Sequence, residues 1–589
     1  MPSAIPLPSD EPQLSFPKRA WRLTYPYWQS EEKVRAWGLL ILILVLNLFG
    51  VYLLYRLNQW NQAFYDALQE KNAKAFWEQI WVFCTIATFW VLVAVYKAYV
   101  QQILQMRWRN WLNKNFLDRW LRDRTYYQME LARNETDNPD QRIAEDLNKF
   151  TNGTLGLGVG LLNATVTLVT FIGVLWGISG PLNFSLAGHA ISIPGYMVWG
   201  CILYALIGSL VTHWIGRQLI PINFRQQRFE ADFRFDLVRL RESSEQVALY
   251  QGESSEHKRL IGRFNSVMDN FWQLIKANKR LGWFTFSFGQ AAVIFPFFLA
   301  GSRYFSGAIT LGMLMQISSA FGRVQEALSW FVDNYSAVDK NDNLVTWRAT
   351  ADRLLQFQAA MDRAESQTKG VSINIQASSD AALHLNDVTL ALPNGHPLLK
   401  EVNLKIISGE KLLLSGASGS GKSTLFRAIA GIWPFGSGRI SRPEGKRTLF
   451  LPQKPYLPIG SLRDTVSYPG KPGEFSDGAI VAALSACKLE GLTARLDEQQ
   501  HWGQQLSPGE QQRLAFARAL LHKPDWLFMD EATSALDEAT EQEMYRLLSE
   551  QLPHTTFVSI AHRPNVAAFH TRRMVISPGA DGTMTLQPN

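Results

Sequence analysis

Long apolar stretches in the first 330 residues limit most strongly how this chain can fold. Six of them approach or exceed the roughly 20 residues that a membrane-spanning helix needs, and no stretch after Gln356 comes near that length. A soluble helical core explains them poorly, because a segment such as AWGLLILILVLNLFGVYLLY is apolar on nearly all sides. The sequence therefore predicts six membrane helices and the lipid bilayer as a partner. The predicted spans are residues 36–55, 77–100, 154–177, 195–215, 282–305 and 307–330.

The positive charge of the chain lies mainly in two loops between these spans. The net charge is +7, from 58 Lys and Arg against 51 Asp and Glu. Segment 101–153 carries nine basic residues and segment 216–281 carries twelve, whereas the loop at 179–194 carries none. Basic loops stay on the cytoplasmic side of a membrane, so both long loops and the C-terminal half are predicted to be cytoplasmic. The first outer loop, with Arg56, Lys71 and Lys74, fits this rule less well. The charge does not indicate a nucleic-acid partner.

Changes in composition divide the chain into four parts. Residues 1–35 are rich in proline and lack the pattern of a cleaved signal, so we expect a flexible cytoplasmic tail. The membrane part is predicted at 36–355, a polar linker at 356–382 and an α/β domain at 383–589. The three cysteines, at positions 84, 201 and 487, have no metal-ligand spacing and indicate neither a disulfide framework nor a zinc site.

A glycine-rich segment follows an alternating strand pattern in the C-terminal part. EVNLKIISGEKLLLSG runs directly into GASGSGKST, which is the G-x-x-x-x-G-K-[ST] phosphate loop between a strand and a helix. Glycines allow successive N–H groups to surround a phosphate at the helix N-terminus. Lys422 is expected to reach the β- and γ-phosphates, and Ser423 to offer its hydroxyl to Mg²⁺. The predicted loop residues are Gly416, Ala417, Ser418, Gly419, Ser420, Gly421, Lys422, Ser423 and Thr424.

Four polar residues after apolar segments complete the predicted chemistry. Asp530 and Glu531 end the strand PDWLFMDE, where the first would hold Mg²⁺ and the second would act as general base for the attacking water. His562 in VSIAHRP is expected to contact the γ-phosphate from the same sheet edge. Gln453 in LFLPQKP can offer its carbonyl to Mg²⁺, although taken on its own it is better explained as a structural glutamine.

These motifs, in this order, resemble the ATP-binding cassette family over about 200 residues. The resemblance includes the signature LSPGE at 506–510 and the SALD loop at 534–537. It implies that the signature touches ATP held by a second cassette, through Ser507, Gly509 and Glu510, and therefore a homodimer with two composite ATP sites. Two departures from the family pattern, Pro508 in the signature and Leu392 where many relatives place an aromatic on adenine, leave ATP turnover and base selectivity open.

The membrane half resembles one subgroup of half-transporters. The strings TDNPDQRIAEDLNKF at 136–150 and SSEQVALYQGESSEHKRL at 243–260 are similar to elements of the peroxisomal acyl-CoA transporters and of bacterial relatives of SbmA and BacA. LNQWNQAFYDALQ at 57–69 and LMQISSAFGRVQEALSWFVDNY at 314–335 favour the bacterial, YddA-like branch.

That resemblance implies a six-helix, exporter-type (type IV) membrane domain fused to a RecA-like α/β cassette in the bacterial inner membrane. It also implies ATP-driven import of bulky hydrophilic solutes such as corrinoids, bleomycin-like compounds or antimicrobial peptides. Transport of acyl-CoA or lipid, export, and a membrane ATPase that senses without transporting stay open as alternatives.

A polar stripe in the sixth predicted span bears on the solute path. Gln316, Ser319, Arg323 and Glu326 recur at three- and four-residue steps and share one helix face. Ionisable residues at membrane depth line a wet cavity or pair with one another. The stripe is therefore a hypothetical lining of a translocation cavity, and the alternative is that Arg323 and Glu326 already lie in the cytoplasm as a solvated pair.

Overall fold

The computed structural model describes residues 16–131, 138–186, 189–336, 343–367, 373–579 and 583–588, and the chain forms two compact units. The helical unit comprises Met1–Asp118 and Thr136–Gln358. The α/β unit comprises Arg119–Glu135 and Ala359–Asn589, so part of the first long loop belongs with the C-terminal half. Each unit has its own core and is described separately.

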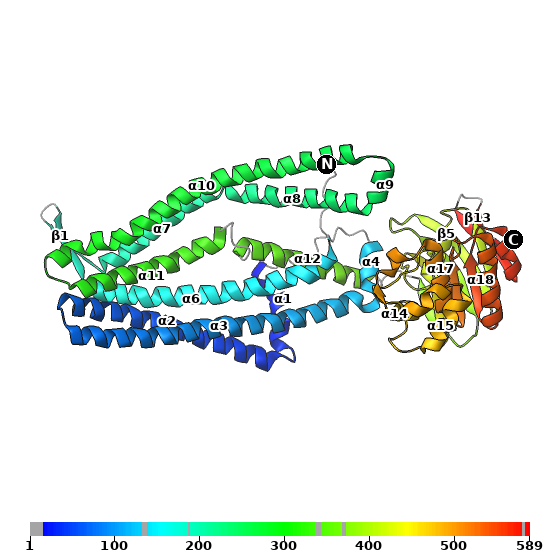
Figure 1. Ribbon diagram of the computed structural model, residues 1–589, viewed down its shortest axis with the longest axis horizontal. Coiled ribbons are helices and arrows are strands. Elements are labelled where there is room, and N and C mark those ends of the chain that lie inside the picture. Colours follow the sequence, from blue (N-terminus) through cyan, green and yellow to red (C-terminus); the bar gives the residue numbers. More distant parts are fainter. Residues whose placement is uncertain are drawn as a thin grey trace. The chain divides into compact units, whose positions relative to one another are not determined.

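The helical unit consists of long helices joined by short connections (Figure 1). Five helical segments in the described chain are long and apolar enough to cross a membrane: Lys33–Gln69, Ala73–Leu131, Pro139–Ser179, Tyr196–Gly216 and Glu253–Phe305. The sixth predicted span forms helix α11, which is not among these five. The helices are α1 (Phe16–Gln29), α2 (Lys33–Gln69), α3 (Ala73–Leu121), α5 (Pro139–Gln141), η2 (Arg142–Asp146), α6 (Leu147–Ser179), α7 (Tyr196–Gly216), α8 (Leu219–Glu242), α9 (Ser244–Leu249), α10 (Glu253–Phe305), α11 (Leu311–Ser336) and α12 (Leu344–Gln367).

Helix α11 lies at the centre of this unit, where it packs against α2, α6, α7 and α10. Its Ile317 and Phe321 are buried with Phe171 of α6 and Cys201 of α7. Many apolar side chains face outward instead, and Phe298 of α10 is 79% exposed. An exposed apolar surface of this kind is what lipid covers in a membrane protein. The hairpin that links α6 and α7 has two strands, β1 (Pro181–Leu186) and β2 (His189–Pro194).

The predicted N-terminal tail is a helix from Phe16 onward, which corrects the expectation of a flexible segment. Helix α1 buries Ala20, Leu23 and Tyr27, and the Tyr27 ring stacks on Trp108 of α3 with 5.7 Å between centroids. Proline obscured this helix in the sequence, although its buried residues recur at helical spacing. Residues 1–15 of the predicted tail lie outside the described part of the chain.

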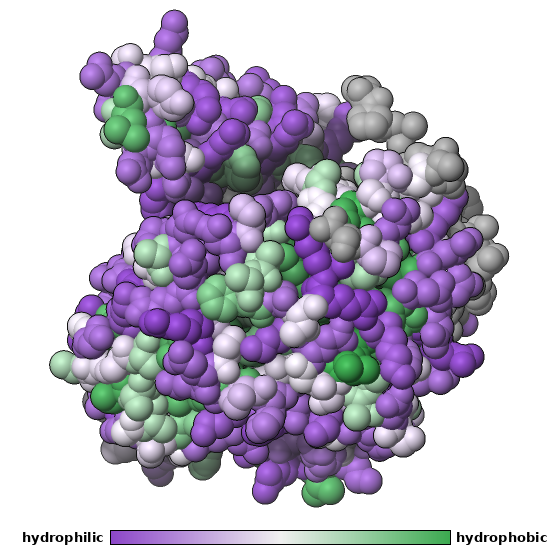
Figure 2. Space-filling model, turned by 90° about the vertical axis from the view of Figure 1, so that its right-hand side faces the viewer, coloured by the Kyte–Doolittle hydropathy of each residue, from purple (hydrophilic) through white to green (hydrophobic). Residues whose placement is uncertain are grey.

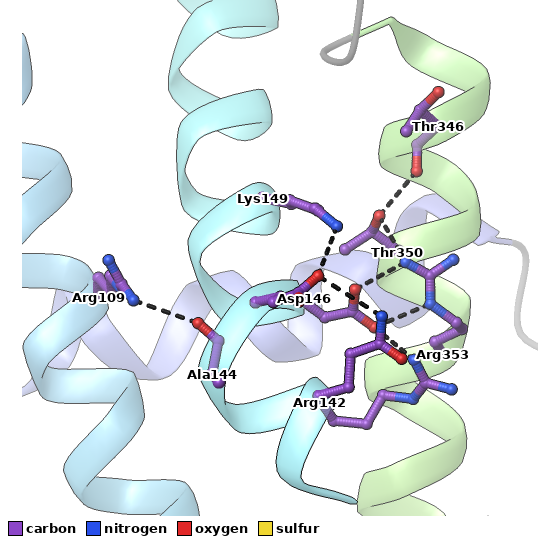
Figure 3. A network of polar contacts seen from close by, with 10 residues as sticks. Arg109, Arg142, Ala144, Asp146, Lys149, Thr346, Thr350 and Arg353 are labelled. Atoms are coloured by element: carbon purple, nitrogen blue, oxygen red, sulfur yellow. Dashed lines mark hydrogen bonds and ion pairs between the residues drawn. The ribbon is translucent and has the colours of Figure 1, made fainter. Parts of the chain in front are cut away.

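A buried carboxylate joins the beginning of α6 to α12 (Figure 3). Asp146 is 1% exposed and ends a short π-helix, η2. It accepts hydrogen bonds from Arg353 Nε at 2.8 Å, Arg353 Nη2 at 2.7 Å and Arg142 Nη1 at 2.9 Å. Three charge-assisted bonds satisfy a carboxylate that would otherwise be costly to bury. The string TDNPDQRIAED therefore positions α12, except that its residues 136–137 lie outside the described residues.

The α/β unit is built on a ten-stranded sheet with the order β3-β7-β4-β5-β14-β13-β6-β12-β11-β8. Strands β8, β11, β12, β6 and β13 are parallel neighbours. β11 and β12 are almost wholly buried, as parallel strands covered on both faces are. The strands are β3 (Asn374–Ser378), β4 (Leu383–Ala391), β5 (Pro397–Ile406), β6 (Lys411–Gly416), β7 (Gly436–Pro443), β8 (Thr448–Leu451), β11 (Trp526–Asp530), β12 (Thr556–Ile560), β13 (Arg572–Pro578) and β14 (Met584–Pro588).

Helices and short turns surround this sheet, and the face of the unit seen in Figure 2 is mostly hydrophilic. A second, two-stranded sheet pairs β9 (Gly460–Ser461) with β10 (Gln499–Gln500). The helices are η1 (Arg122–Arg124), α4 (Thr125–Leu131), α13 (Lys422–Ile429), α14 (Leu462–Ser467), α15 (Asp477–Ala486), η3 (Glu490–Arg495), α16 (Trp502–Gln505), α17 (Pro508–His522), α18 (Glu538–Gln551) and η4 (Pro564–Phe569).

The segment 356–382, predicted as a linker, is largely regular structure. Helix α12 continues through it to Gln367, with Ala360, Met361 and Ala364 buried. Strand β3 follows and pairs with β7 at the edge of the large sheet. The polar composition that suggested a linker reflects one exposed helix face and an edge strand whose residues are mostly exposed.

Candidate functional site

The loop between β6 and α13 has the backbone that a phosphate cradle requires. Gly416, Gly419 and Gly421 have φ of 151°, 79° and 96°, a region that residues with a side chain rarely adopt. A Cβ on Gly416 would lie 2.7 Å from the Ile576 carbonyl oxygen, so glycine is required there for space as well. The loop then opens helix α13, whose first-turn N–H groups suit an anion.

Lys422 begins α13 and points back into the loop. Its Nζ donates to the carbonyl oxygens of Gly416 at 2.8 Å and Ala417 at 2.7 Å. Burial lowers the pKa of the Lys422 ammonium, while Glu531 and Asp530 raise it. The cation is thus held at the mouth of the loop, next to the acidic end of β11.

Ser423 and Asp530 form an oxygen pair beside the loop. Ser423 Oγ donates to Asp530 Oδ1 at 3.0 Å, which joins the start of α13 to the end of β11. Burial raises the pKa of Asp530, and the hydrogen bond from Ser423 lowers it. Hydroxyl and carboxylate oxygens are ligands that Mg²⁺ accepts, so this pair fits the predicted ion.

Glu531 lies between the two residues predicted from the neighbouring strands. Its Oε2 accepts from Gln453 Nε2 at 3.0 Å, and its Oε1 lies 2.9 Å from His562 Nε2. Gln453 follows β8 and His562 follows β12, and both strands flank β11. Parallel strands present their carboxyl ends at one sheet edge, which explains why residues 78 and 31 positions away meet Glu531.

The signature residues form the N-terminus of α17. Ser507 is the N-cap, Pro508 occupies the first turn, and Glu510 closes a capping box with Ser507. Ser507 and Pro508 are exposed, and Gly509 is half-buried. In the described structure the side-chain hydrogen bonds of Ser507 go to Glu510 and not to the phosphate loop. One chain therefore brings together all the predicted site elements except the signature.

Sequence reasoning missed Gln512, which ties the signature helix to two loops. Its buried amide donates to the Gln453 carbonyl and to Ser534 Oγ, each at 3.0 Å, and accepts from the Ala535 N–H at 2.9 Å. It lies five residues after Ser507 on α17, so it connects the signature helix to the loop at Gln453 and to the SALD loop. A glutamine in the run GEQQR carries no signal that separates this role from a surface position.

Fold and site together define an ATP-binding domain fused to a bundle of membrane helices. The comparisons agree: a family model described as ABC transporter transmembrane region 2 matches residues 23–305, and one described as ABC transporter matches residues 399–534. The inner membrane ABC transporter ATP-binding protein YddA of Escherichia coli strain K12 is 33% identical over 92% of this chain and 94% of its own.

A human lysosomal cobalamin transporter, ABCD4, is 26% identical over 93% of this chain and 92% of its own. A solved bacterial Atm1-family ABC exporter with ATP bound has a TM-score of 0.68 at 18% identity, over 94% of each chain. The likeness confirms the predicted exporter-type fold.

The chain belongs to the ABC transporter family, as a half-transporter with one membrane domain and one cassette. It is accordingly a multi-pass membrane protein that binds ATP and couples ATP hydrolysis to transport.

Proposed function

We propose that two copies of this chain form a homodimer that hydrolyses ATP at two composite sites and imports a bulky hydrophilic solute, such as a corrinoid, a bleomycin-like compound or an antimicrobial peptide. The observation that carries the choice of solute is a polar pocket between α10 and α11. Placement in a bacterial inner membrane follows the likeness to YddA, and a corrinoid solute follows the likeness to ABCD4.

In this proposal the cassette residues divide the chemistry of hydrolysis. Lys422 leaves the carbonyls of its own loop and binds the β- and γ-phosphates. Glu531 accepts a proton from the attacking water, and Gln453 and His562 hold its two oxygens in place. In the same proposal His562 would also contact the γ-phosphate.

The predicted magnesium ion has a consistent set of oxygen donors. Ser423 and Asp530 would hold it, with the side-chain carbonyl oxygen of Gln453 as a third ligand. When bound, the ion neutralises charge on the phosphate oxygens. Without it, the Ser423 to Asp530 hydrogen bond keeps both side chains in position.

Two exposed surfaces support the homodimer. The first is the signature end of α17, where Ser507 is exposed and, among the described residues, its side chain bonds Glu510 and not the phosphate loop of its own chain. The second is the tip formed by α9 and the residue after it, where Leu249 is 76% and Tyr250 is 88% exposed. Two adjacent apolar side chains exposed this strongly form a small patch that another protein surface can cover, and we assign its cover to the cassette of the second copy.

The first long loop already contacts the cassette fold of its own chain. Arg124 Nη1 donates to the Ala430 carbonyl at the end of α13 at 2.9 Å, and Leu131 of α4 packs against the core of the sheet. Arg119 Nε donates to Glu365 Oε1 of α12 at 2.9 Å. Because α13 begins at the phosphate loop, these contacts provide a route by which nucleotide binding can move a membrane helix.

The pocket that supports a hydrophilic solute has a volume of about 450 Å³. Helix α11 supplies a polar face at four- and three-residue steps, and α10 supplies small or apolar residues. Polar groups at membrane depth line wet paths, so the pocket suits a solute that retains its hydrogen bonds. Its lining residues are Gly289, Ala292, Val293, Ser318, Gly322, Gln325, Glu326 and Ser329.

The polar stripe predicted from the sequence coincides with this pocket at one position, Glu326. Gln316 is 5% exposed, and its backbone carbonyl accepts from Asn58 of α2 at 3.0 Å, so it packs inside the bundle. Arg323 Nη1 pairs with Glu326 Oε2 at 2.9 Å. We therefore propose that the adjacent face of α11, which carries Ser318 and Gln325, lines the cavity instead of the predicted stripe.

The test is transport by the purified protein in sealed vesicles with the cassettes facing outward. On adding ATP and Mg²⁺, cobalamin or a bleomycin-like peptide should move across the membrane, and Gln325→Leu and Ser318→Val should slow this movement while ATP hydrolysis persists. Thr88→Val is the matched control, because Thr88 is exposed on α3 and its hydroxyl bonds the Cys84 carbonyl of its own helix. Movement of acyl-CoA alone would indicate the lipid alternative, and hydrolysis without movement of any solute would indicate a sensor.

A further inference from the structure

The N-terminus of α17 already holds an anion of its own. The Ser507 N–H donates to Glu510 Oε2 at 2.9 Å, and Ser507 Oγ donates to the same oxygen at 2.7 Å. The Glu510 N–H in turn donates to Ser507 Oγ at 3.4 Å. Pro508 has no N–H, so Gly509 supplies the one remaining backbone donor of this first turn with no hydrogen bond in the described structure. Both donors of Ser507 are therefore committed to one carboxylate oxygen.

A carboxylate at this place competes with a phosphate. Helix N-termini attract anions through their N–H groups and their dipole, and Glu510 uses the donors that a phosphate would need. An ionised carboxylate accepts hydrogen bonds and donates none, so it offers nothing to phosphate oxygens and repels their charge. This departs from the expectation that Glu510 contacts ATP together with Ser507 and Gly509. The hydrogen bonds from Ser507 lower the pKa of Glu510, which keeps it ionised at neutral pH.

We propose that Glu510 is a positioning residue that regulates the composite ATP site by holding Ser507 until the γ-phosphate of ATP on the second copy displaces it. This inference rests on the proposed homodimer. Because the γ-phosphate must first displace the Glu510 carboxylate from Ser507, a higher ATP concentration is needed to close the two cassettes. The groups around Glu531 are unchanged. The side chain thus sets the ATP threshold of the transporter and does not take part in the hydrolytic step.

The same chain contains a matched arrangement that serves as control. Ser461 caps α14, its Oγ donates to Asp464 Oδ2 at 2.7 Å, and the Asp464 N–H donates back to Ser461 Oγ at 3.1 Å. Two of the three hydrogen bonds between Ser507 and Glu510 recur here with a shorter acid, and the bond from the serine N–H to the carboxylate belongs to Ser507 alone. No predicted nucleotide ligand lies on α14. Asp464→Asn therefore shows how the loss of a charged capping side chain alone affects ATP hydrolysis.

The experiment is an ATP titration of hydrolysis by the full-length protein in lipid nanodiscs. Glu510→Gln keeps an oxygen acceptor for Ser507 and removes the charge, so the KM for ATP should fall by about threefold or more while kcat stays within about twofold. Asp464→Asn should leave the KM at the parent value. Glu510→Ala, which removes the acceptor as well, should also lower the KM. An unchanged or raised KM in both Glu510 variants overturns the proposal.

A further variant separates this inference from the proposed function. Ser507→Ala removes a donor to the γ-phosphate, so the composite site requires its KM to rise. If Ser507→Ala raises the KM and Glu510→Gln leaves it unchanged, the competitor role of Glu510 is wrong and the composite site stands. If neither variant changes the KM, the signature does not contact ATP, and both proposals are wrong.

Discussion

Replacing Asp146 by asparagine should destabilise the helical unit far more than replacing the neighbouring Glu145 by glutamine. Asp146 is buried and bonded by two guanidinium groups (Figure 3). Glu145 is exposed and pairs with Lys149 at 3.0 Å. The substitution Asp146→Asn retains the shape of the side chain and removes its charge. Arg142 and Arg353 then lose the charged carboxylate that both of them bond.

The size of the effect follows from the exposure of the partners. Removing one member of a buried ion pair costs about 3–5 kcal/mol when the remaining charge cannot reach water. The Arg353 side chain is 35% exposed and rehydrates in part, whereas the Arg142 side chain is 10% exposed. We therefore expect a loss of about 2–3 kcal/mol, below the full range for a buried pair.

The assay is thermal unfolding in detergent, followed by tryptophan fluorescence, with Glu145→Gln as control. The midpoint of Asp146→Asn should fall by roughly 3–4 °C, by the usual relation between free energy and midpoint for a unit of this size. Glu145→Gln should not change it, because exposed pairs four residues apart contribute little. A double-mutant cycle with Arg353→Met should show strong coupling to position 146. Equal midpoints for the two single variants would refute the assigned role of the buried network.

Three further predictions concern hydrolysis and the pocket. Glu531→Gln should reduce the ATPase rate by about 10²–10⁴-fold while ATP binding persists, and near-normal phosphate release would exclude Glu531 as the general base. Chelation of Mg²⁺ should abolish hydrolysis and leave some ATP binding. The Asp530→Asn variant should need more Mg²⁺ than the parent protein for its half-maximal rate, and an unchanged requirement would contradict the assignment of Asp530 as a ligand. With the exposed Cys84 replaced by serine, Gln325→Cys should react with a membrane-impermeant thiol reagent and Val169→Cys, on a 68% exposed apolar position, should not; equal labelling would contradict a wet pocket.

The sequence was sufficient for the features that depend on local patterns and strand ends. The phosphate loop could be predicted because its glycines and Lys422 adjoin an apolar strand. The meeting of Gln453, Glu531 and His562 could be predicted because parallel strands share an edge. The exporter-type fold was implied by the resemblance of the membrane and cassette motifs to a known family, and the likeness to the solved Atm1-family exporter confirms it.

The features that the sequence could not predict depend on packing between residues that are distant in the chain. Periodicity placed Gln316 and Glu326 on one face of α11, but only packing shows that Gln316 meets α2 and that Gln325 faces the pocket. Helix α1 remained hidden because Tyr27 is held by Trp108 of another helix. Strand β3 was hidden because an edge strand with mostly exposed residues resembles a polar linker.

The central claim is that each ATP is held between two copies, and mixed dimers test it most directly. Lys422→Ala and Ser507→Ala chains are given different tags, and dimers that carry both tags are purified. Each mutant homodimer has two damaged sites, whereas the mixed dimer has one doubly damaged site and one intact site. We predict that the mixed dimer hydrolyses ATP clearly faster than either mutant homodimer. A mixed dimer no faster than the mean of the two homodimers, or full activity of a parent monomer, would contradict the account.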